Sequence, residues 1–312
     1  MLANMKNIIK RYGDQTVVDH INLEIAKGEV LGLLGPNGAG KSTTISMLCG
    51  LLNADGGSIT LFGQQQSVKN LNARRELGLV TQDITLFSEL SVIENLHYIG
   101  GLYGLRGKEL AQRTQEVLDF IDLKDHTKKK PKQLSGGMQR RLNIGCAIMH
   151  RPKLLIMDEP TVGIDPQSRN YILESVKKLA SEGTAIIYTS HYMEEVEAVC
   201  DRVIIMDVGR IIAEGTTEDL IRRVSHEDCV HLTAVQPSPE LTMHLEAVQG
   251  VKQVTLSGKK YTIVSIAGSG NINRITEIAQ KHGGIAGITE QTATLEDVFL
   301  TLTGKALREG GN

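Results

Sequence analysis

Nine residues, GPNGAGKST from Gly35 to Thr43, constrain this chain more than any other feature. The stretch fits the pattern G-x-x-x-x-G-K-[ST] and stands between the apolar run VLGLL and a helix-like segment, TISMLCGLL. Glycines let successive backbone N–H groups curl around an anion, and the N-terminus of the following helix adds a partial positive charge. The stretch therefore predicts a polyphosphate-binding loop between a strand and a helix.

The residue types in this loop predict how a nucleoside triphosphate is held. Lys41 is expected to reach the β- and γ-phosphates, and the Ser42 hydroxyl is expected to bind Mg²⁺. The other loop residues are expected to surround the phosphates: Gly35, Pro36, Asn37, Gly38, Ala39, Gly40 and Thr43. The loop alone, however, does not hydrolyse a nucleotide.

A pair of carboxylates at the end of another apolar segment, LLIMDEP, supplies the second requirement. Adjacent strand positions point to opposite sides, so Asp158 and Glu159 can divide two tasks. We expect Asp158 to join the Mg²⁺ shell and Glu159 to act as general base toward the attacking water. A strand-end carboxylate can also simply cap the next turn, and that alternative stands for either residue taken alone.

Strand-like and helix-like segments alternate along most of the chain. The expected strands are HINLEI, VLGLL, SITLFG, LGLVTQ, KLLIMD, TAIIYTS, and RVIIMD with GRIIAEG as a closing hairpin. The expected helices cover residues 43–52, 92–103, 108–121 and 166–181, and the segment MEEVEAVC. Continuous apolar runs such as LLIM and AIIY indicate a parallel sheet covered on both faces. The predicted fold class is therefore α/β.

The pattern changes after the helix-like segment TTEDLIRRV. From about His226 the segments read strand, helix, strand, strand, helix, strand, helix, with QPSP as a stretch that resists regular structure. This order predicts a small α+β module. We therefore expect a nucleotide-binding domain over residues 1–225 and an accessory domain over residues 226–312.

Composition and charge restrict the setting of the chain. It has 312 residues, 41% of them hydrophobic, and a formal charge of -2, which argues against nucleic acid as a partner despite the lysines at 128–132. No run approaches the roughly 18 apolar residues of a membrane span, and the N-terminus lacks the apolar core of a secretion signal. We expect a chain that is soluble in isolation and cytosolic, with its four cysteines buried and reduced.

A second anion-ready helix start lies in LSGGMQRRLNIGCAIM. Ser135, Gly136 and Gly137 precede an amphipathic helix, and such an N-terminus suits an anion. Read locally, the three residues are equally well explained as a helix cap. Ser135 lies 23 residues before Asp158. This spacing favours an anion site over a simple cap only when the chain is compared with a protein family.

Taken together, these motifs make residues 2–224 resemble the ATP-binding cassette (ABC) family. The family's ordered set is present as an aromatic residue (Tyr12), GPNGAGKST, a strand-end glutamine (Gln82), LSGG, LLIMDE, the VGIDP turn (Asp165) and a histidine after a strand (His191). Met138 departs from the glutamine most common in the family and leaves Ser135 to Gly137 intact. The resemblance implies a P-loop NTPase ABC cassette with an inserted helical subdomain at about residues 92–150.

The resemblance also implies ATP and Mg²⁺ as cofactors and a second cassette as a partner. In ABC proteins two cassettes pack head to tail, and each ATP lies between the phosphate loop of one and the signature, here Ser135 to Gly137, of the other. The second cassette is either another copy of this chain or a paralogous one.

The remaining motif residues acquire roles by the same resemblance. Tyr12 stacks on adenine, Gln82 contacts Mg²⁺ or the attacking water, Asp165 joins the nucleotide site, and His191 contacts the γ-phosphate while Lys41 neutralises it. Each also has a plain structural alternative. These are a strand-edge tyrosine, a surface amide, a helix N-cap and a strand-end histidine, respectively.

Three functions compete. The first is an ATPase subunit at the cytoplasmic face of the membrane that energises a transmembrane permease on separate chains, which the segment DITLFSELSVIENL faces in the family. The second is a soluble ABC ATPase acting on nucleic acid or ribosomes, although those relatives carry coiled-coil insertions or two cassettes on one chain. The third is an ATP-sensing regulatory module, which is expected to lack a base at the position of Glu159.

The C-terminal module favours the first function. A cassette followed by a small domain that ends in TLEDVFLTLTG resembles the ATP-binding subunits of bacterial drug and antibiotic exporters, among them those of the linearmycin-resistance type. Import or lipid export remains an alternative, and the cargo is not encoded in this chain. The module itself is expected to brace the dimer or regulate it.

Overall fold

A computed structural model describes residues 1–224, 227–291 and 293–304, and these residues form two compact units. The first spans Met1–Thr216 and the second Thr217–Gly304. The boundary lies ahead of the expected one at residue 225, because α8 (Thr217–Val224) packs on α11 (Leu295–Thr303) of the second unit. Residues 305–312, expected at the end of the accessory domain, lie outside the described residues.

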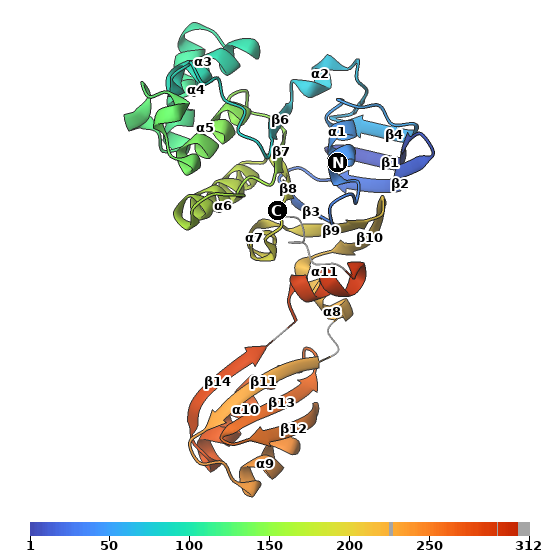
Figure 1. The fold of residues 1–312 in the computed structure, drawn as a ribbon, viewed down its shortest axis with the longest axis vertical. Coiled ribbons are helices and arrows are strands. Elements are labelled where there is room, and N and C mark those ends of the chain that lie inside the picture. Colours follow the sequence, from blue (N-terminus) through green and yellow to red (C-terminus); the bar gives the residue numbers. More distant parts are fainter. Residues whose placement is uncertain (225–226, 292, 305–312) are drawn as a thin grey trace. The chain divides into compact units, whose positions relative to one another are not determined.

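A six-stranded sheet in the order β10-β9-β3-β8-β7-β6 forms the centre of the first unit (Figure 1). All neighbouring pairs are parallel except β9 and β10, which form an antiparallel hairpin. The predicted parallel sheet and closing hairpin are therefore confirmed. The strands are β3 (Val30–Leu34), β6 (Leu77–Val80), β7 (Leu154–Asp158), β8 (Ala185–Thr189), β9 (Arg202–Asp207) and β10 (Arg210–Gly215).

A second, antiparallel sheet has the order β2-β1-β4-β5. Its strands are β1 (Ala3–Tyr12), β2 (Gln15–Ile25), β4 (Gly56–Leu61) and β5 (Gln64–Gln65). Strand β1 was not expected from the sequence. Its register against β2 shifts between Met5 and Ile8, and Asn7 there has a φ of 49°. Such a bulge interrupts the period-two alternation by which an amphipathic strand is recognised.

Most helices of the first unit lie close to where the sequence predicts them, but the short helix at Leu71–Arg74 was not expected. They are α1 (Lys41–Leu48), α2 (Leu71–Arg74), α3 (Val92–Leu102), α4 (Gly107–Phe120), α5 (Gly136–Ile148), α6 (Pro166–Ser181) and α7 (Met193–Val199), with short 3-10 turns at Lys124–His126 and Pro131–Gln133. Helix α1 is shorter than predicted, because it was expected to continue to residue 52. It ends earlier since Gly50 adopts a left-handed φ of 65°.

Both faces of the central sheet are covered, because alternate residues of each strand enter different cores. On β7, Leu154 and Ile156 pack with α1 and the antiparallel sheet. Leu155 and Met157 pack on the opposite side with residues of α3, α4, α5 and α6. This alternation follows from the two-residue period of a strand and explains why the whole run is apolar.

Helices α3, α4 and α5 pack on one another and form a group at one side of the central sheet (Figure 1). The segment before α3 is held by a fully buried amide, Asn95. Its Nδ2 donates to the carbonyls of Phe87, Leu90 and Ser91 at 3.0–3.2 Å, and its Oδ1 accepts from the Phe87 N–H at 2.9 Å. A single buried side chain therefore fixes the loop that leads from β6 into this helical group.

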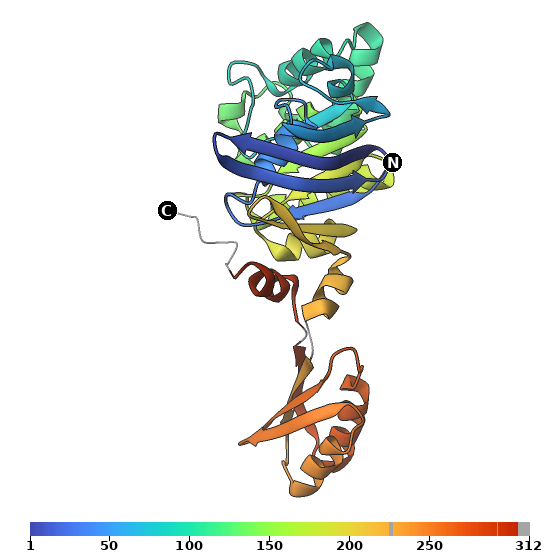
Figure 2. The same ribbon diagram turned by 90° about the vertical axis from the view of Figure 1, so that its right-hand side faces the viewer.

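The second unit is an antiparallel sheet in the order β12-β13-β11-β14. Its elements are β11 (Glu227–Ala234), α9 (Pro239–Glu246), β12 (Val251–Ser257), β13 (Lys260–Ile266), α10 (Ile272–His282) and β14 (Ile285–Gln291), besides α8 and α11. One core joins the sheet to α9 and α10, which lie on the same side of it in Figure 2. The predicted α+β order is observed.

Across the described parts of both units, none of the helices combines the length and apolar character needed to span a bilayer.

Candidate nucleotide-binding and hydrolysis site

Three predicted motifs meet at one edge of the central sheet. Strands β3, β8 and β7 are parallel neighbours, so their carboxyl ends lie side by side. The loop Gly35–Thr43 follows β3, Asp158 and Glu159 lie at the end of β7, and His191 follows β8. Ligand sites in open α/β sheets form at this edge, where successive loops diverge.

The loop has the backbone that an anion cradle requires. Gly40 immediately precedes α1 with a φ of 98°, and a Cβ built on it would lie 2.7 Å from the Val17 carbonyl oxygen. Gly38 has a φ of 81° and is exposed at the top of the loop. Only glycine fits at position 40. The left-handed backbone at Gly38 and Gly40 directs N–H groups into the loop.

Lys41 is the cation of the loop. Its ammonium donates to the carbonyl oxygens of Gly35 at 2.6 Å and Pro36 at 3.2 Å. Burial lowers the pKa of Lys41, and the nearby carboxylates of Glu159 and Asp158 oppose part of that shift. A partly desolvated ammonium close to both carboxylates is placed where phosphate oxygens can replace the carbonyl contacts.

A threonine that the sequence did not single out organises the two carboxylates. Thr189, at the end of β8, donates from Oγ1 to Asp158 Oδ1 at 2.7 Å. The same hydroxyl oxygen accepts the Glu159 backbone N–H at 2.9 Å. The signal was present as the threonine of YTSH, but its importance depends on β7 and β8 being neighbours.

Glu159 and His191 are in direct contact. His191 Nε2 lies 2.6 Å from Glu159 Oε1. Glu159 has a φ of 49°, in the left-handed region that residues with a Cβ rarely adopt. Such backbone conformations concentrate at functional sites. His191 Nδ1 is buried and forms no hydrogen bond within the described residues.

Gln82 lies beyond the end of β6, at the same edge of the sheet, with an exposed side chain. Hydrogen bonds hold the backbone at Gln82. The buried Arg140 guanidinium of α5 donates to the Thr81 carbonyl at 2.7 Å and also to the Gln82 carbonyl. The loop that carries Gln82 is thus attached to the helix that follows LSGG.

Of the signature residues, Gly137 lies against the start of α6. Ser135 is the N-cap of α5, where its Oγ accepts the Met138 N–H at 3.2 Å. Ser135 and Gly136 are exposed, whereas Gly137 is buried against Asp165 and Ser168. The cap interpretation is therefore correct, and it leaves an exposed helix N-terminus in the monomer.

Tyr12 and Asp165 occupy the places that their structural alternatives require. Tyr12 ends β1 with 53% of its surface exposed, and Lys10 Nζ lies 5.6 Å from its ring centroid. Asp165 is the N-cap of α6 and accepts the Ser168 N–H at 2.9 Å. Neither observation conflicts with a contact to nucleotide.

The residues at this edge of the sheet fit a magnesium nucleotide. The glycine-shaped cradle, the start of α1 and the Lys41 ammonium suit the phosphates. For Mg²⁺, the exposed Ser42 hydroxyl and the Asp158 carboxylate offer oxygen ligands, which that ion prefers.

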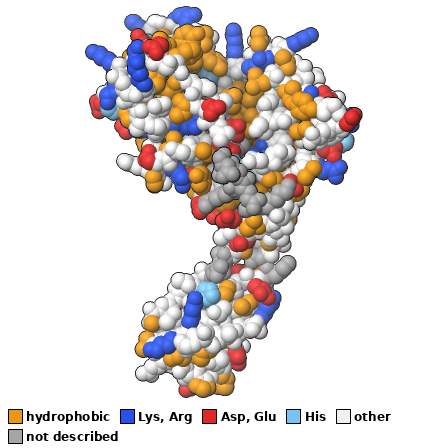
Figure 3. All heavy atoms as spheres, in the orientation of Figure 1, with side chains coloured by type: hydrophobic (Ala, Val, Ile, Leu, Met, Phe, Trp, Pro, Cys, Tyr) orange, Lys and Arg blue, Asp and Glu red, His pale blue; other side chains and the backbone are white. Residues whose placement is uncertain are grey.

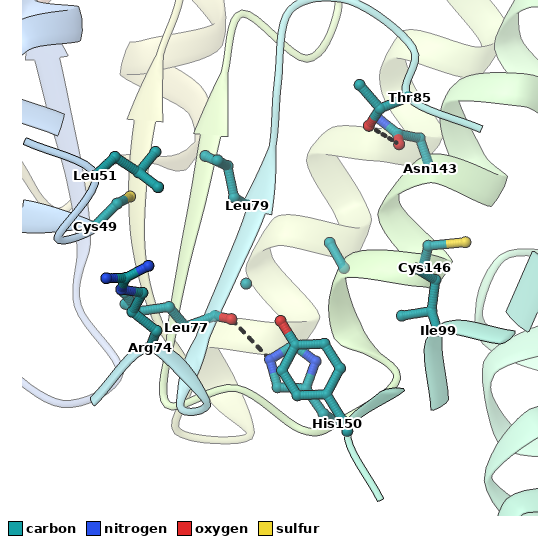
Figure 4. Close-up of a pocket in the computed structure, with 13 residues that line it drawn as sticks. Cys49, Leu51, Arg74, Leu77, Leu79, Thr85, Ile99, Asn143, Cys146 and His150 are labelled. Carbon is teal, nitrogen blue, oxygen red and sulfur yellow. Dashed lines mark hydrogen bonds between the residues drawn. The ribbon is translucent and has the colours of Figure 1, made fainter. Parts of the chain in front are cut away.

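A cavity of about 270 Å³ lies between the central sheet and the helical group. Figure 4 shows Leu79 of β6 and Ile99 of α3 on its walls, together with His150, whose Nε2 donates to the Leu77 carbonyl at 2.8 Å. The Tyr103 ring stacks on His150 at 3.7 Å. Burial lowers the pKa of His150, which favours the neutral ring. The cavity is therefore mostly apolar.

The surface around this cavity carries exposed hydrophobic side chains. Figure 3 shows such side chains over the α3 end of the first unit. The large exposed ones of this region include Leu51, Leu79, Phe87, Tyr98, Leu102 and Tyr103. An apolar patch of this kind on a protein surface commonly marks an interaction site.

The cysteines are free thiols, as expected, but only two of the four are buried, whereas burial was expected for all of them. All four are free, Cys49 and Cys146 are buried, and Cys200 and Cys229 are half-buried. Burial raises the pKa of Cys49 and Cys146 to about 12, which keeps them protonated and unreactive.

One cluster in the second unit resembles a metal site in composition. Glu240, His244 and His282 bring their ligand atoms within 4.8 Å of one another. The two imidazole rings, however, are stacked at 4.2 Å with planes only 17° apart. Nitrogen lone pairs lie in the ring planes, so those of two parallel rings do not converge on one ion. The cluster is not arranged as a metal site.

Comparison with known proteins agrees with this site. Residues 18–162 match the ABC transporter family. The linearmycin resistance ATP-binding protein LnrL of Bacillus subtilis is 45% identical over 99% of this chain and 100% of its own length. A Nod factor export ATP-binding protein I of Cupriavidus metallidurans is 37% identical over 99% of both chains.

A solved structure connects the fold to hydrolysis. The dimeric, post-hydrolysis structure of an ATP-binding cassette with ADP and Pi has a TM-score of 0.63 and 26% identity, over 69% of this chain and 98% of that one. The chain belongs to the ABC transporter family, as an ATP-binding subunit that hydrolyses ATP. The predicted cassette fold, the ATPase activity and the similarity to linearmycin-resistance subunits are confirmed.

Proposed function

We propose that this chain binds ATP with Mg²⁺, hydrolyses it between two cassettes, and thereby drives export of a drug-like or antibiotic cargo through a separate permease. The observation that carries the proposal is the meeting of Lys41, Glu159 and His191 at one edge of the sheet. Two of the similar proteins are named for resistance and export, which supports export over import.

The residues of this chain have distinct roles in the proposed reaction. Lys41 and the backbone N–H groups of its loop hold the phosphates, and Ser42 with Asp158 would hold Mg²⁺, which supplies further positive charge when bound. Glu159 accepts a proton from the attacking water at its carboxylate. Gln82, on its anchored loop, orients that water or joins the Mg²⁺ shell.

His191 completes the site by a small movement. Its Nε2 is held by Glu159 at 2.6 Å, while its buried Nδ1 lacks a partner among the described residues. A buried nitrogen without a hydrogen bond is unfavourable. This supports a ring that turns toward the γ-phosphate when nucleotide binds and then leaves Glu159 free to activate water.

Head-to-tail pairing explains why Ser135 and Gly136 are exposed. Two backbone N–H groups at a capped helix start form an anion site that the chain's own phosphate loop does not use. In the pairing, the signature of one cassette completes the pocket of the other. Tyr12 would stack on the adenine, and Asp165 would line the site next to the partner's nucleotide. The partner is a second copy or a paralogous cassette.

The apolar cavity between β6 and α3 supports docking of a permease. Leu79 and Tyr103 line it and are 37% and 41% exposed. The loop that carries Gln82 adjoins it, since Thr85 of that loop also lines the cavity. A permease segment seated there would contact the loop attached to the signature helix by Arg140. The chain would then act as a peripheral subunit at the cytoplasmic face of the membrane.

The other two functions are less well supported. The net charge of -2 gives no electrostatic reason for nucleic acid binding. A purely ATP-sensing module has no use for Glu159 held against His191. Permease genes next to the gene for this chain would separate transport from soluble action.

Glu159→Gln tests the catalytic assignment. The amide cannot accept the proton, so we expect turnover to fall by roughly 100-fold or more. ATP binding should persist, and a nucleotide-bound dimer should accumulate in light scattering after gel filtration with ATP and Mg²⁺. Glu174→Gln, at an exposed position of α6, is the matched control and should behave as wild type. Normal turnover in Glu159→Gln would sink the assignment, and full turnover by a strict monomer would contradict the pairing.

A further inference from the structure

A buried carboxylate lies next to the hydrolysis site. Glu195, on α7, is 2% exposed. Its Oε2 accepts hydrogen bonds from Thr161 Oγ1 at 2.7 Å, Tyr188 OH at 2.9 Å and Ser190 Oγ at 2.8 Å. Burying a carboxylate is unfavourable unless it is paired and hydrogen-bonded, so these donors are what permits it there.

The three donors come from segments that carry the proposed catalytic groups. Thr161 is two residues after Glu159, and Ser190 directly precedes His191. Tyr188 is fully buried on β8, the strand that leads to His191. One oxygen atom of Glu195 therefore connects the segment that follows Glu159 to the segment that precedes His191.

A cation from α6 adds a fourth contact. Arg169 Nε lies 3.3 Å from Glu195 Oε1, without the alignment of a hydrogen bond. The same guanidinium lies 4.4 Å from the ring centroid of Tyr192, which follows His191. Arg169 thus neutralises the carboxylate, while the three hydroxyls determine its direction.

The hydroxyl network is protected from competing water. Thr161, Tyr188 and Ser190 are 0%, 0% and 4% exposed. Burial, and then the adjacent Glu195 carboxylate, raise the pKa of Tyr188 well above its usual value, so its hydroxyl remains a donor. The three hydrogen bonds to Oε2 restrict the two segments, because a hydroxyl that moves away loses this buried acceptor.

We infer that Glu195 is a positioning residue, whose carboxylate holds the His191 loop and the Glu159 segment in the relative place that hydrolysis requires. The inference rests on the proposed roles of Glu159 and His191. Because Glu195 is buried, it acts through these neighbours and not on the nucleotide itself.

Glu195→Gln with Glu194→Gln as control tests the inference. The glutamine amide removes the negative charge from the shared acceptor. With its oxygen toward the three hydroxyls, its NH₂ group faces the Arg169 guanidinium, which is itself a donor, so the attachment of the two segments is weakened. We expect kcat to fall roughly 10- to 100-fold, as for small misplacements of catalytic groups, with the Kd for ATP changed by less than about twofold. Glu194, exposed on the same helix, should tolerate the identical change. Unchanged kcat in Glu195→Gln overturns the inference.

A double-mutant cycle with His191→Ala separates positioning from general stability. If Glu195 acts through His191, Glu195→Gln should reduce turnover by less than about twofold in the His191→Ala background. A full, multiplicative loss in that background, or a loss of ATP affinity parallel to kcat, means a merely structural role and overturns the inference.

The same cycle distinguishes the two levels of the proposal. Wild-type turnover in His191→Ala alone would contradict the proposed function, because His191 would then have no part in hydrolysis. A loss in His191→Ala with none in Glu195→Gln would contradict only the present inference. Should Glu195→Gln not fold, Ser190→Ala enters the same cycle. It removes the 2.8 Å hydrogen bond to Glu195 and the 3.0 Å hydrogen bond that Ser190 Oγ accepts from the Tyr192 N–H. No loss in Ser190→Ala would then count against the inference.

Discussion

Two adjacent glycines of the signature should respond to the same substitution in opposite ways. Gly137 is packed against the start of α6: a Cβ built on it would lie 2.0 Å from Ser168 Oγ, 2.5 Å from Ser168 Cβ and 2.9 Å from Asp165 Oδ2. Ordinary contacts begin at 3.4 Å. The serine hydroxyl can rotate, but its Cβ cannot, so Gly137→Ala must move α5 away from α6 by about 1 Å. Gly136 meets no heavy atom within 4 Å.

The expected magnitudes follow from these contacts. Inserting a methyl group into a packed contact costs about 1–3 kcal/mol of unfolding free energy. In a domain of this size each kcal/mol lowers Tm by roughly 2–4 °C, so Gly137→Ala should lower it by about 2–12 °C. Gly136→Ala should not lower Tm, because alanine favours a helix more than glycine does. It should nevertheless reduce ATP turnover, since Gly136 faces the partner's nucleotide in the proposed pairing.

Calorimetric unfolding and steady-state ATP hydrolysis, measured on both variants and wild type, test this contrast. Equal Tm values for Gly137→Ala and wild type would refute the close packing of α5 on α6. A drop in Tm for Gly136→Ala as large as that for Gly137→Ala would refute the difference between the two sites. Full turnover in Gly136→Ala would count against the pairing alone.

Two further changes probe the cap of α6 and the apolar cavity. Hydrogen bonds from Ser168 lower the pKa of Asp165 below 3.8, so this carboxylate stabilises the fold above its unfolded pKa and loses that contribution as pH falls through the folded value. Asp165→Ala should therefore lower Tm near neutral pH by an amount that shrinks below about pH 4, and a deficit that grows in acid would contradict this. Leu79→Asp should abolish co-purification with the permease and leave ATP turnover of the isolated chain intact. The control Val208→Asp, at an exposed position outside the cavity, should keep both. Retained association of Leu79→Asp would argue against docking at the cavity.

The local features of this protein were available from its sequence. The phosphate loop was recognisable because Gly38 and Gly40 permit left-handed backbone at fixed offsets from Lys41, which is a property of neighbouring residues. The cap at Ser135 and the start of α6 at Pro166 were predictable for the same reason. The order of the motifs then identified the cassette, and the apolar runs indicated a parallel sheet.

Tertiary structure decided what depends on distant segments. Strand β1 was missed because a bulge broke its pattern, and α8 belongs to the second unit because of packing on α11. The roles of Thr189 and Glu195 were not predictable, since Thr189 meets Asp158 and Thr161 meets Glu195 only because β7 and β8 are neighbours.

The sequence by itself therefore determined the backbone conformation of the loop and the chemistry of Lys41, Asp158 and Glu159. Only the fold determined that these groups lie near His191 and that one hydroxyl, that of Thr189, contacts both Asp158 and Glu159. Backbone preference is set by a residue and its neighbours, whereas a sheet order is selected by burial of side chains far apart in the chain.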